Sequence, residues 1–428
     1  MRAVASVTAT LMFPLWAWLA FPQILLYLYT FSLPLEGVFA IEGVFTLSKG
    51  LLGLFLLALA FQVRRPKIAW FPALVLTWRQ VPRLRISILA VLLMFWACAS
   101  YFWSVDPSAT WDKLQALAQH LIGALAIAFF IMARPKTLQP LLFSYSLGAL
   151  VAAFQGISNY LRNPSSRSSF AGSADAADFA AIVLLGSLVA VGLWLTAKSS
   201  WMRWYSLACF AACTLAVVLS GTRSAWVAII VTLFLVILPR LGWQRMLSIS
   251  LMLALCFVAL YQLPAVNQFL ATRVTSATED GGAGRTAIWT VGWHIAQQNL
   301  LIGHGYGTFT SLFGLGAATE SALESIDTYY ITDGRGAHNI YLELVSEIGL
   351  VGLGIFLAWM WVLLRVSLRQ SVHPDLILIL KACLLAYLIQ GAFLGILERK
   401  YLWLTIALLH GLSMMFRGTT YASTPPKS

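Results

Sequence analysis

The sequence predicts an all-α integral membrane protein with about twelve transmembrane helices. Of its 428 residues, 60% are hydrophobic and only 10% are charged, and the mean hydropathy is +0.81. A soluble domain cannot bury so much apolar surface, so the lipid bilayer must surround most of the chain. The sequence also contains repeated apolar runs of about 20 residues, the length at which a helix crosses a bilayer.

Twelve apolar runs follow one another along the chain and predict the membrane spans. They cover residues 8–30, 43–63, 86–104, 115–133, 138–160, 176–197, 201–220, 224–239, 245–264, 341–364, 376–396 and 400–416. One long connection separates the ninth run from the tenth. The chain therefore divides into the first nine spans (1–264), a long loop (265–340), and the last three spans with a short tail (341–428).

The charged residues set the predicted orientation. With the N-terminus inside the cell, 17 of the 28 Lys and Arg residues fall in inner loops or termini, as the positive-inside rule requires. Of the 16 acidic residues, only Asp375 is then inside. Both termini are therefore predicted to be cytoplasmic. The net charge of +12 follows from this distribution, so it does not indicate a nucleic-acid-binding protein.

Ten basic residues fall on the outer side, where membrane topology does not favour them, and each is a candidate for binding a specific anion. They are Lys49, Lys113, Arg162, Arg167, Arg223, Arg273, Arg285, Arg335, Arg399 and Lys400. The simpler interpretation is that half or more of them pair with nearby acidic residues.

The long outer loop has a pattern of its own. Residues 284–299 predict an amphipathic helix, which should lie on the membrane bundle or in the interface. Its apolar stripe consists of Ile288, Trp289, Gly292, Trp293 and Ala296. The glycine-rich sequence GHGYGTF (303–309), which contains Tyr306, predicts a tight turn after this helix.

Two outer arginines stand where an anion would be favoured. Arg223 lies in the short hairpin SGTRSAW near the membrane boundary, where its planar guanidinium could hold a phosphate at two points. It could instead snorkel or pair with a carbonyl at a helix end. Arg285 begins the amphipathic helix, whose N-terminus favours an anion. The alternative is that Arg285 pairs with a preceding acidic residue.

A third group of ionisable residues stands where the tenth span begins. Asn339, Glu343 and Glu347 recur every four residues and share one face of the predicted helix. The helix dipole accounts for Glu343 without any function, whereas Glu347 lies deeper. His338 precedes them, and its ordinary pKa of about 6.5 lets it accept a proton near neutral pH. A lone histidine is nevertheless more often structural than catalytic.

Metal ions and cofactors have no support in the sequence. The five Cys residues lie inside apolar runs without metal-ligand spacing, and no P-loop or metal-binding motif occurs in a supportive context. We therefore expect neither a metal nor a cofactor.

Three blocks, in this order, resemble the O-antigen ligase and polymerase superfamily of membrane glycosyltransferases. They are GTRSAW (221–226), GRTAIW…LLIGHGYGTF (284–309) and HNIYLELVSEIGLVG (338–352). In the last block, nine residues separate His338-Asn339 from Gly349-x-x-Gly352, a spacing associated with the ligases.

The resemblance implies an O-antigen ligase of lipopolysaccharide biosynthesis in a Gram-negative inner membrane. Such an enzyme transfers a glycan from undecaprenyl diphosphate to a sugar hydroxyl of the lipid A–core oligosaccharide, with inversion and without a metal. Its partners would be these two substrates and the membrane lipids. Loop 265–340 would be periplasmic, with short helices and elements of the active site.

The resemblance and the chemistry of the residues together suggest individual roles. His338 is the expected general base, and the donor diphosphate is expected to be bound by Arg223, Arg285 and Arg335. Orientation of the base or binding of the acceptor is expected from Asn339, Glu343, Glu347 and Tyr306.

Other functions stay open. An O-antigen polymerase would share most of these residues and use a second lipid-linked glycan as acceptor. A protein O-oligosaccharyltransferase usually has a further domain after its last span, which the short tail does not favour. A lipid-linked glycan transporter would suit twelve spans, with Lys381 as its main buried charged residue.

Overall fold

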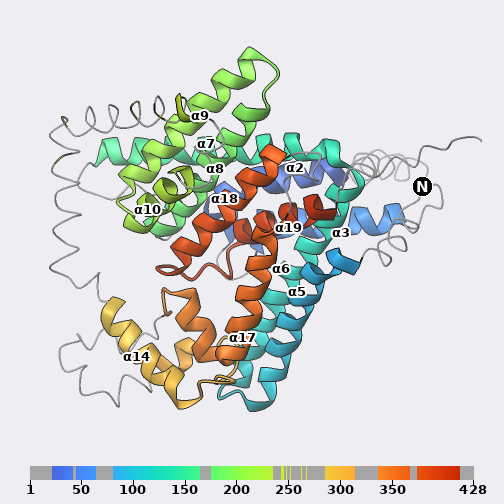
Figure 1. The fold of residues 1–428 in the computed structure, drawn as a ribbon, viewed down its shortest axis with the longest axis vertical. Helices are drawn as coiled ribbons and strands as arrows, with labels where there is room; N and C mark the ends of the chain where they lie inside the picture. The colour runs from blue at the N-terminus through green and yellow to red at the C-terminus, as the bar shows by residue number, and fades with distance from the viewer. Residues whose placement is uncertain are drawn as a thin grey trace, which may run out of the picture.

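The computed structural model describes residues 22–41, 45–63, 81–163, 175–234, 285–313, 336–366 and 374–414, and a few single positions between 242 and 267. This part of the chain is almost entirely helical (Figure 1). Its sheet is a short antiparallel hairpin, in which β1 (Ala40–Ile41) pairs with β2 (Phe45–Thr46).

The described helices follow the order of the predicted spans. They are α2 (Pro22–Ser32), η1 (Leu33–Phe39), α3 (Leu47–Val63), α5 (Val81–Ala99), η2 (Ser100–Trp103), α6 (Pro107–Ala133), η3 (Pro135–Thr137), α7 (Leu138–Arg162), α8 (Ala176–Thr196), α9 (Ser200–Leu219), α10 (Arg223–Thr232), α14 (Arg285–Gln298), α17 (Ile340–Leu364), α18 (Pro374–Gly391) and α19 (Lys400–Met414).

Six helices of the described part are long and apolar enough to cross a membrane. They are Pro107–Ala133, Pro135–Arg162, Ala176–Thr196, Ser200–Leu219, Ile340–Leu364 and Pro374–Gly391. The protein is therefore a multi-pass membrane protein. The total of twelve spans stays a prediction, because most of predicted spans 245–264 and 8–30 lies outside the described residues.

Two details differ from the sequence-based expectation. α18 ends at Gly391, before the predicted residue 396, and turns occupy the stretch from there to α19. Trp293, expected on the apolar stripe of α14, is 48% exposed. The buried stripe instead includes Val291 and Ile295, because the face that packs is rotated slightly from the predicted one.

The helices pack into one bundle with α8 at its centre. α8 packs against α7, α9 and α18, and α6 packs against α19. α14 lies against α17 in the lower part of the view in Figure 1, away from α9 and α10. The amphipathic helix predicted in the long loop therefore rests on a predicted membrane span, as expected.

Candidate functional site

The tenth predicted span is broken, and the glycine-rich turn bonds to the break. α17 changes direction at Gly349, whose φ of 69° and ψ of −174° are not helical. The N–H of Gly305 donates to the carbonyl of Glu347 (2.8 Å), and the N–H of Leu350 donates to the carbonyl of Leu300 (2.9 Å). Backbone groups that lose their helical hydrogen-bond partners at the break thus form hydrogen bonds elsewhere inside the protein.

Two glycines allow these backbones to meet. Gly349 and Gly303 both have positive φ, 69° and 71°. An added Cβ would overlap the carbonyl of Leu301 at the first position and the backbone of Glu347 at the second. Glycine alone meets both requirements, which explains why the turn and the span each need one.

His338 lies two residues before the start of α17, in an unusual backbone conformation. Its φ of 46° is the only positive φ of a non-glycine residue in the described part of the chain. Trp289 of α14 donates its indole N–H to the carbonyl of Ala337, the residue before His338 (3.1 Å), and its ring centroid lies 6.0 Å from that of Phe393. His338 is therefore held where α14, α17 and the turns after α18 meet. Strained backbone of this kind is frequent at functional sites.

Arg285 stands on the helix that contacts the residue before His338. It is the first residue of α14, as predicted, and stands one helical turn before Trp289. Residues four apart on a helix leave the same face. Trp289 bonds to the carbonyl of the residue before His338, so Arg285 stands one helical turn from that contact.

Asn339 is the N-cap of α17. Its side-chain oxygen accepts hydrogen bonds from the N–H groups of Tyr341 (3.0 Å) and Leu342 (3.2 Å). This cap fixes the start of α17 at Ile340, two residues after His338.

Glu343, Glu347 and Tyr306 line a cavity of about 10 Å³, which holds about one water molecule. The predicted common face of the two glutamates is confirmed. Glu347 is 3% exposed and its carboxylate accepts from the N–H of Phe309 (3.2 Å), so it fixes the chain after the glycine-rich turn. Burial, and then the charge of Glu347, raise the pKa of the Tyr306 phenol well above its usual value, so Tyr306 stays neutral.

Arg223 begins α10, beside the start of α8. The hydroxyl of Thr222 donates to the carbonyl of Ala176, the first residue of α8 (3.2 Å). In the same turn of α8, Asp178 pairs with Arg399 (2.6 Å). Arg223 therefore lies where two helices begin. Arg335 lies outside the described residues.

A cavity of about 700 Å³ lies between η1, α3, α6, α8 and the start of α19. Its charged lining consists of Glu36, Lys49, Asp112, Lys113, Asp178, Glu398, Arg399 and Lys400. Lys113 and Glu398 form an ion pair and also line the one-water cavity of Glu343 and Glu347. This pair therefore stands between the two cavities.

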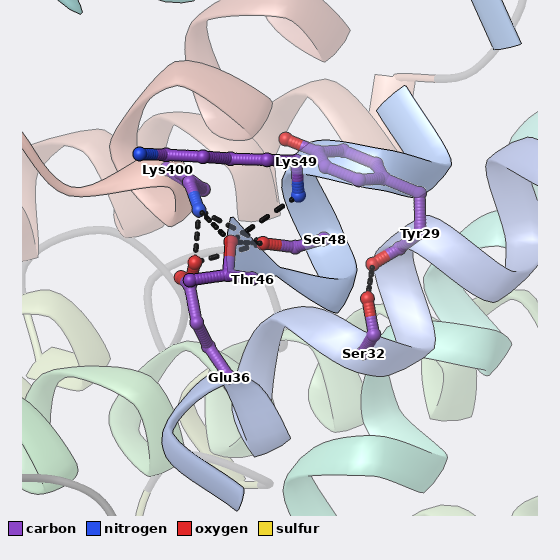
Figure 2. Close-up of polar contacts among 7 residues, drawn as sticks. All are labelled: Tyr29, Ser32, Glu36, Thr46, Ser48, Lys49 and Lys400. Carbon is purple, nitrogen blue, oxygen red and sulfur yellow. Dashed lines mark hydrogen bonds and ion pairs between the residues drawn. The ribbon is translucent and has the colours of Figure 1, made fainter. Parts of the chain in front are cut away.

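Lys400 ties one wall of the large cavity together (Figure 2). Its ammonium pairs with Glu36 and donates to the hydroxyls of Thr46 (3.0 Å) and Ser48 (2.8 Å), which uses its three N–H groups. Burial alone would raise the pKa of Glu36, but the Lys400 charge and hydrogen bonds from Lys400, Ser48 and Thr46 lower it on balance. Glu36 is thus held ionised.

The sequence did not show that these charged residues form one cavity. Lys49, Lys113, Arg399 and Lys400 belong to the ten outer basic residues, and the last three do pair with acidic residues. Their partners come from loops far apart in the chain, and no spacing pattern reveals which loops meet. In the described part of the chain, no group of three or more His, Cys, Asp or Glu residues is arranged to hold a metal ion.

Residues 207–357 match the family model described as O-antigen ligase. The match covers every residue that the sequence analysis assigned to the site, from Arg223 to Glu347. It includes none of the charged residues that line the large cavity. No curated protein matches the chain.

Proposed function

We propose that this protein, a multi-pass membrane protein with an O-antigen ligase domain over residues 207–357, transfers a glycan from undecaprenyl diphosphate to a sugar hydroxyl of the lipid A–core oligosaccharide. The reaction would take place at the periplasmic face of a Gram-negative inner membrane, with both termini cytoplasmic. One observation carries the proposal: within the matched domain, Trp289 of α14 donates to the carbonyl of Ala337, the residue before His338.

His338 is the proposed general base. The acceptor hydroxyl oxygen forms a bond to the anomeric carbon while the bond from that carbon to the diphosphate oxygen breaks. His338 takes the hydroxyl proton, and the diphosphate leaves with the electron pair. Attack from the face opposite the diphosphate inverts the anomeric centre. Such a base typically contributes about 10²–10⁴-fold to the rate.

Arg223 and Arg285 are the proposed partners of the diphosphate, with Arg335 as a third. Both described arginines are the first residues of helices, α10 and α14, where the helix dipole adds positive charge. Negative charge grows on the leaving oxygen as the glycosidic bond breaks. Positive groups aimed at that oxygen therefore stabilise the transition state more than the bound substrate.

The remaining residues have proposed supporting roles. Asn339 positions His338 by fixing the start of α17, as its cap contacts indicate. Glu343, Glu347 and Tyr306 line the one-water cavity and are proposed to orient the base or the acceptor. No step requires a metal ion or a nucleotide sugar.

A transporter is less well supported. In transporters, the free backbone groups of broken helices bind the cargo. In α17 the carbonyl of Ser346 accepts from the N–H of His304 (3.1 Å), and that of Glu347 accepts from Gly305. The ammonium of Lys381 donates to the carbonyl of Val366, which follows α17. These two carbonyls and the ammonium group are thus already hydrogen-bonded within the protein.

Reconstitution tests the proposal. Purified protein in liposomes receives a polyprenyl-diphosphate-linked glycan and purified lipid A–core acceptor, with and without a chelator. We expect the glycan on the core acceptor and free polyprenyl diphosphate in equal amounts, with the same yield in chelator. Longer lipid-linked chains would indicate a polymerase instead, and translocation without covalent transfer would indicate a transporter.

A further inference from the structure

The large cavity has the size of a ligand-binding site and balanced charge. Its volume of about 700 Å³ is within the roughly 300–1,000 Å³ usual for small-molecule sites. Four basic residues (Lys49, Lys113, Arg399 and Lys400) and four acidic residues (Glu36, Asp112, Asp178 and Glu398) line it. The balance argues against a diphosphate, because carboxylates would face its negative oxygens.

The mixture of donors and acceptors suits hydroxyl groups. A hydroxyl donates one hydrogen bond and accepts up to two, so a polyol can bond both to Lys49 and to Asp112, which take part in no ion pair among the described residues. Gln119, His120 and Ser48 add neutral polar groups to the lining, and Phe179 and Leu52 add apolar surface. Sugar rings combine such hydroxyls with apolar C–H faces.

Several lining residues carry buried polar atoms that have no hydrogen-bond partner within the part of the chain that the structure describes. They are the hydroxyl of Tyr401, Oδ1 of Asp178 and Nε of Arg399. Tyr401 is only 5% exposed. Buried polar groups are normally paired, so this wall has unused capacity for a polar ligand. The Tyr401 hydroxyl, the Asp178 acceptor and the Arg399 donor match the hydrogen-bonding groups of a sugar.

The cavity is also close to the proposed reaction site. Phe393 contacts Trp289 beside His338, and Glu398 lines the cavity. Glu398 follows Phe393 by five positions in the chain, so at most about 18 Å of chain joins the two places. One oligosaccharide can reach from the cavity to His338.

We propose that this cavity binds the uncharged sugar residues of a glycan substrate through their hydroxyl groups, while the diphosphate is held elsewhere. The inference rests on the proposed transferase function. The sugars belong either to the donor glycan or to the acceptor oligosaccharide, which share this chemistry.

Lys49→Gln and Asp112→Asn are the test variants. Both residues line the cavity and are exposed, and neither takes part in an ion pair among the described residues, so both variants should fold. Lys198→Gln is the matched control, because Lys198 is exposed between α8 and α9 and does not line the cavity.

Calorimetry with full-length protein in detergent measures binding without turnover. The probes are donor-type glycan freed of its lipid diphosphate, acceptor-type oligosaccharide freed of lipid and phosphate, and inorganic diphosphate. We expect one oligosaccharide to bind, at least fivefold more weakly to Lys49→Gln and Asp112→Asn and unchanged to Lys198→Gln. Inorganic diphosphate should not compete. The oligosaccharide that binds shows whether the cavity takes the sugars of the donor glycan or those of the acceptor.

Three results would overturn the inference: neither oligosaccharide binds, both cavity variants bind like the wild type, or inorganic diphosphate displaces the sugar. In the transfer assay, the same variants should raise the KM for one substrate and leave kcat within about twofold. If transfer occurs and neither KM changes, the cavity inference fails and the proposed function stands. If wild-type protein binds sugar but transfers none, the proposed function fails.

Discussion

The N–H of Gly305 and the carbonyl of Glu347 form a 2.8 Å hydrogen bond across the break in α17. This bond joins the glycine-rich turn to a predicted membrane span. Glu347 reinforces the junction from its other end, because its carboxylate accepts from the N–H of Phe309. Segments some forty residues apart in the chain are thereby held together by two hydrogen bonds.

Gly349→Ala should destabilise the protein by more than about 2 kcal/mol. The backbone at Gly349 (φ 69°, ψ −174°) lies in a region essentially restricted to glycine, so an alanine there costs about 1–3 kcal/mol, and the new Cβ would also overlap the carbonyl of Leu301. Gly354→Ala is the control, because it lies in the same helix with open space around its Cβ. That variant should be neutral or more stable by up to about 1 kcal/mol. Thermal unfolding in detergent compares them, and equal midpoints would contradict the structure of the break.

Glu36→Gln should destabilise the protein because it leaves the Lys400 ammonium, whose side chain is 11% exposed, without its counter-charge. Breaking a buried pair costs about 3–5 kcal/mol, and we expect the lower end because Glu36 is 30% exposed. The double variant Glu36→Gln/Lys400→Gln should lose less than Glu36→Gln alone. If, in chemical unfolding, the double variant loses as much free energy of unfolding as Glu36→Gln and Lys400→Gln added together, the two residues do not interact.

Asp106 should make stability depend on pH in the acid range. Hydrogen bonds from the hydroxyls of Ser108 (2.6 Å) and Ser311 (2.7 Å), then from the N–H of Ala109, lower its pKa to about 2. The unfolded pKa is about 3.9, so this contribution is complete above pH 4 and is lost as the pH falls toward 2. The difference in unfolding midpoint between wild type and Asp106→Asn should therefore shrink over that window. A constant difference would argue against ionised Asp106 as the acceptor.

Arg223→Lys should reduce kcat/KM at least tenfold while the protein stays inserted and abundant. Lysine keeps the charge but cannot hold a phosphate at two points through a planar fork. Arg203→Lys is the control, because Arg203 lies in the first turn of α9 and is exposed. Transfer kinetics in liposomes measure both variants. Near-normal activity of Arg223→Lys would mean that a point charge suffices there.

The positions of the helices were easier to predict from the sequence than the contacts between helices and loops. Apolar runs predicted most described helices within a few residues, and helical periodicity predicted α14, although Trp293 is on its exposed side. The break at Gly349 was not visible, because hydropathy continues through it and its cause is a distant turn. The pairing of Lys113 with Glu398 was equally hidden, because it depends on loop contacts that no local pattern encodes.

Single-turnover transfer by His338 variants tests the central claim most directly. His338→Ala removes the base, and His338→Asn does so with a residue that tolerates the positive φ of 46° at this position. With radiolabelled donor and excess core acceptor in liposomes, both variants should insert normally and form product at least about 10²-fold more slowly than wild type. Product formation by His338→Asn at near the wild-type rate would contradict the proposed reaction site.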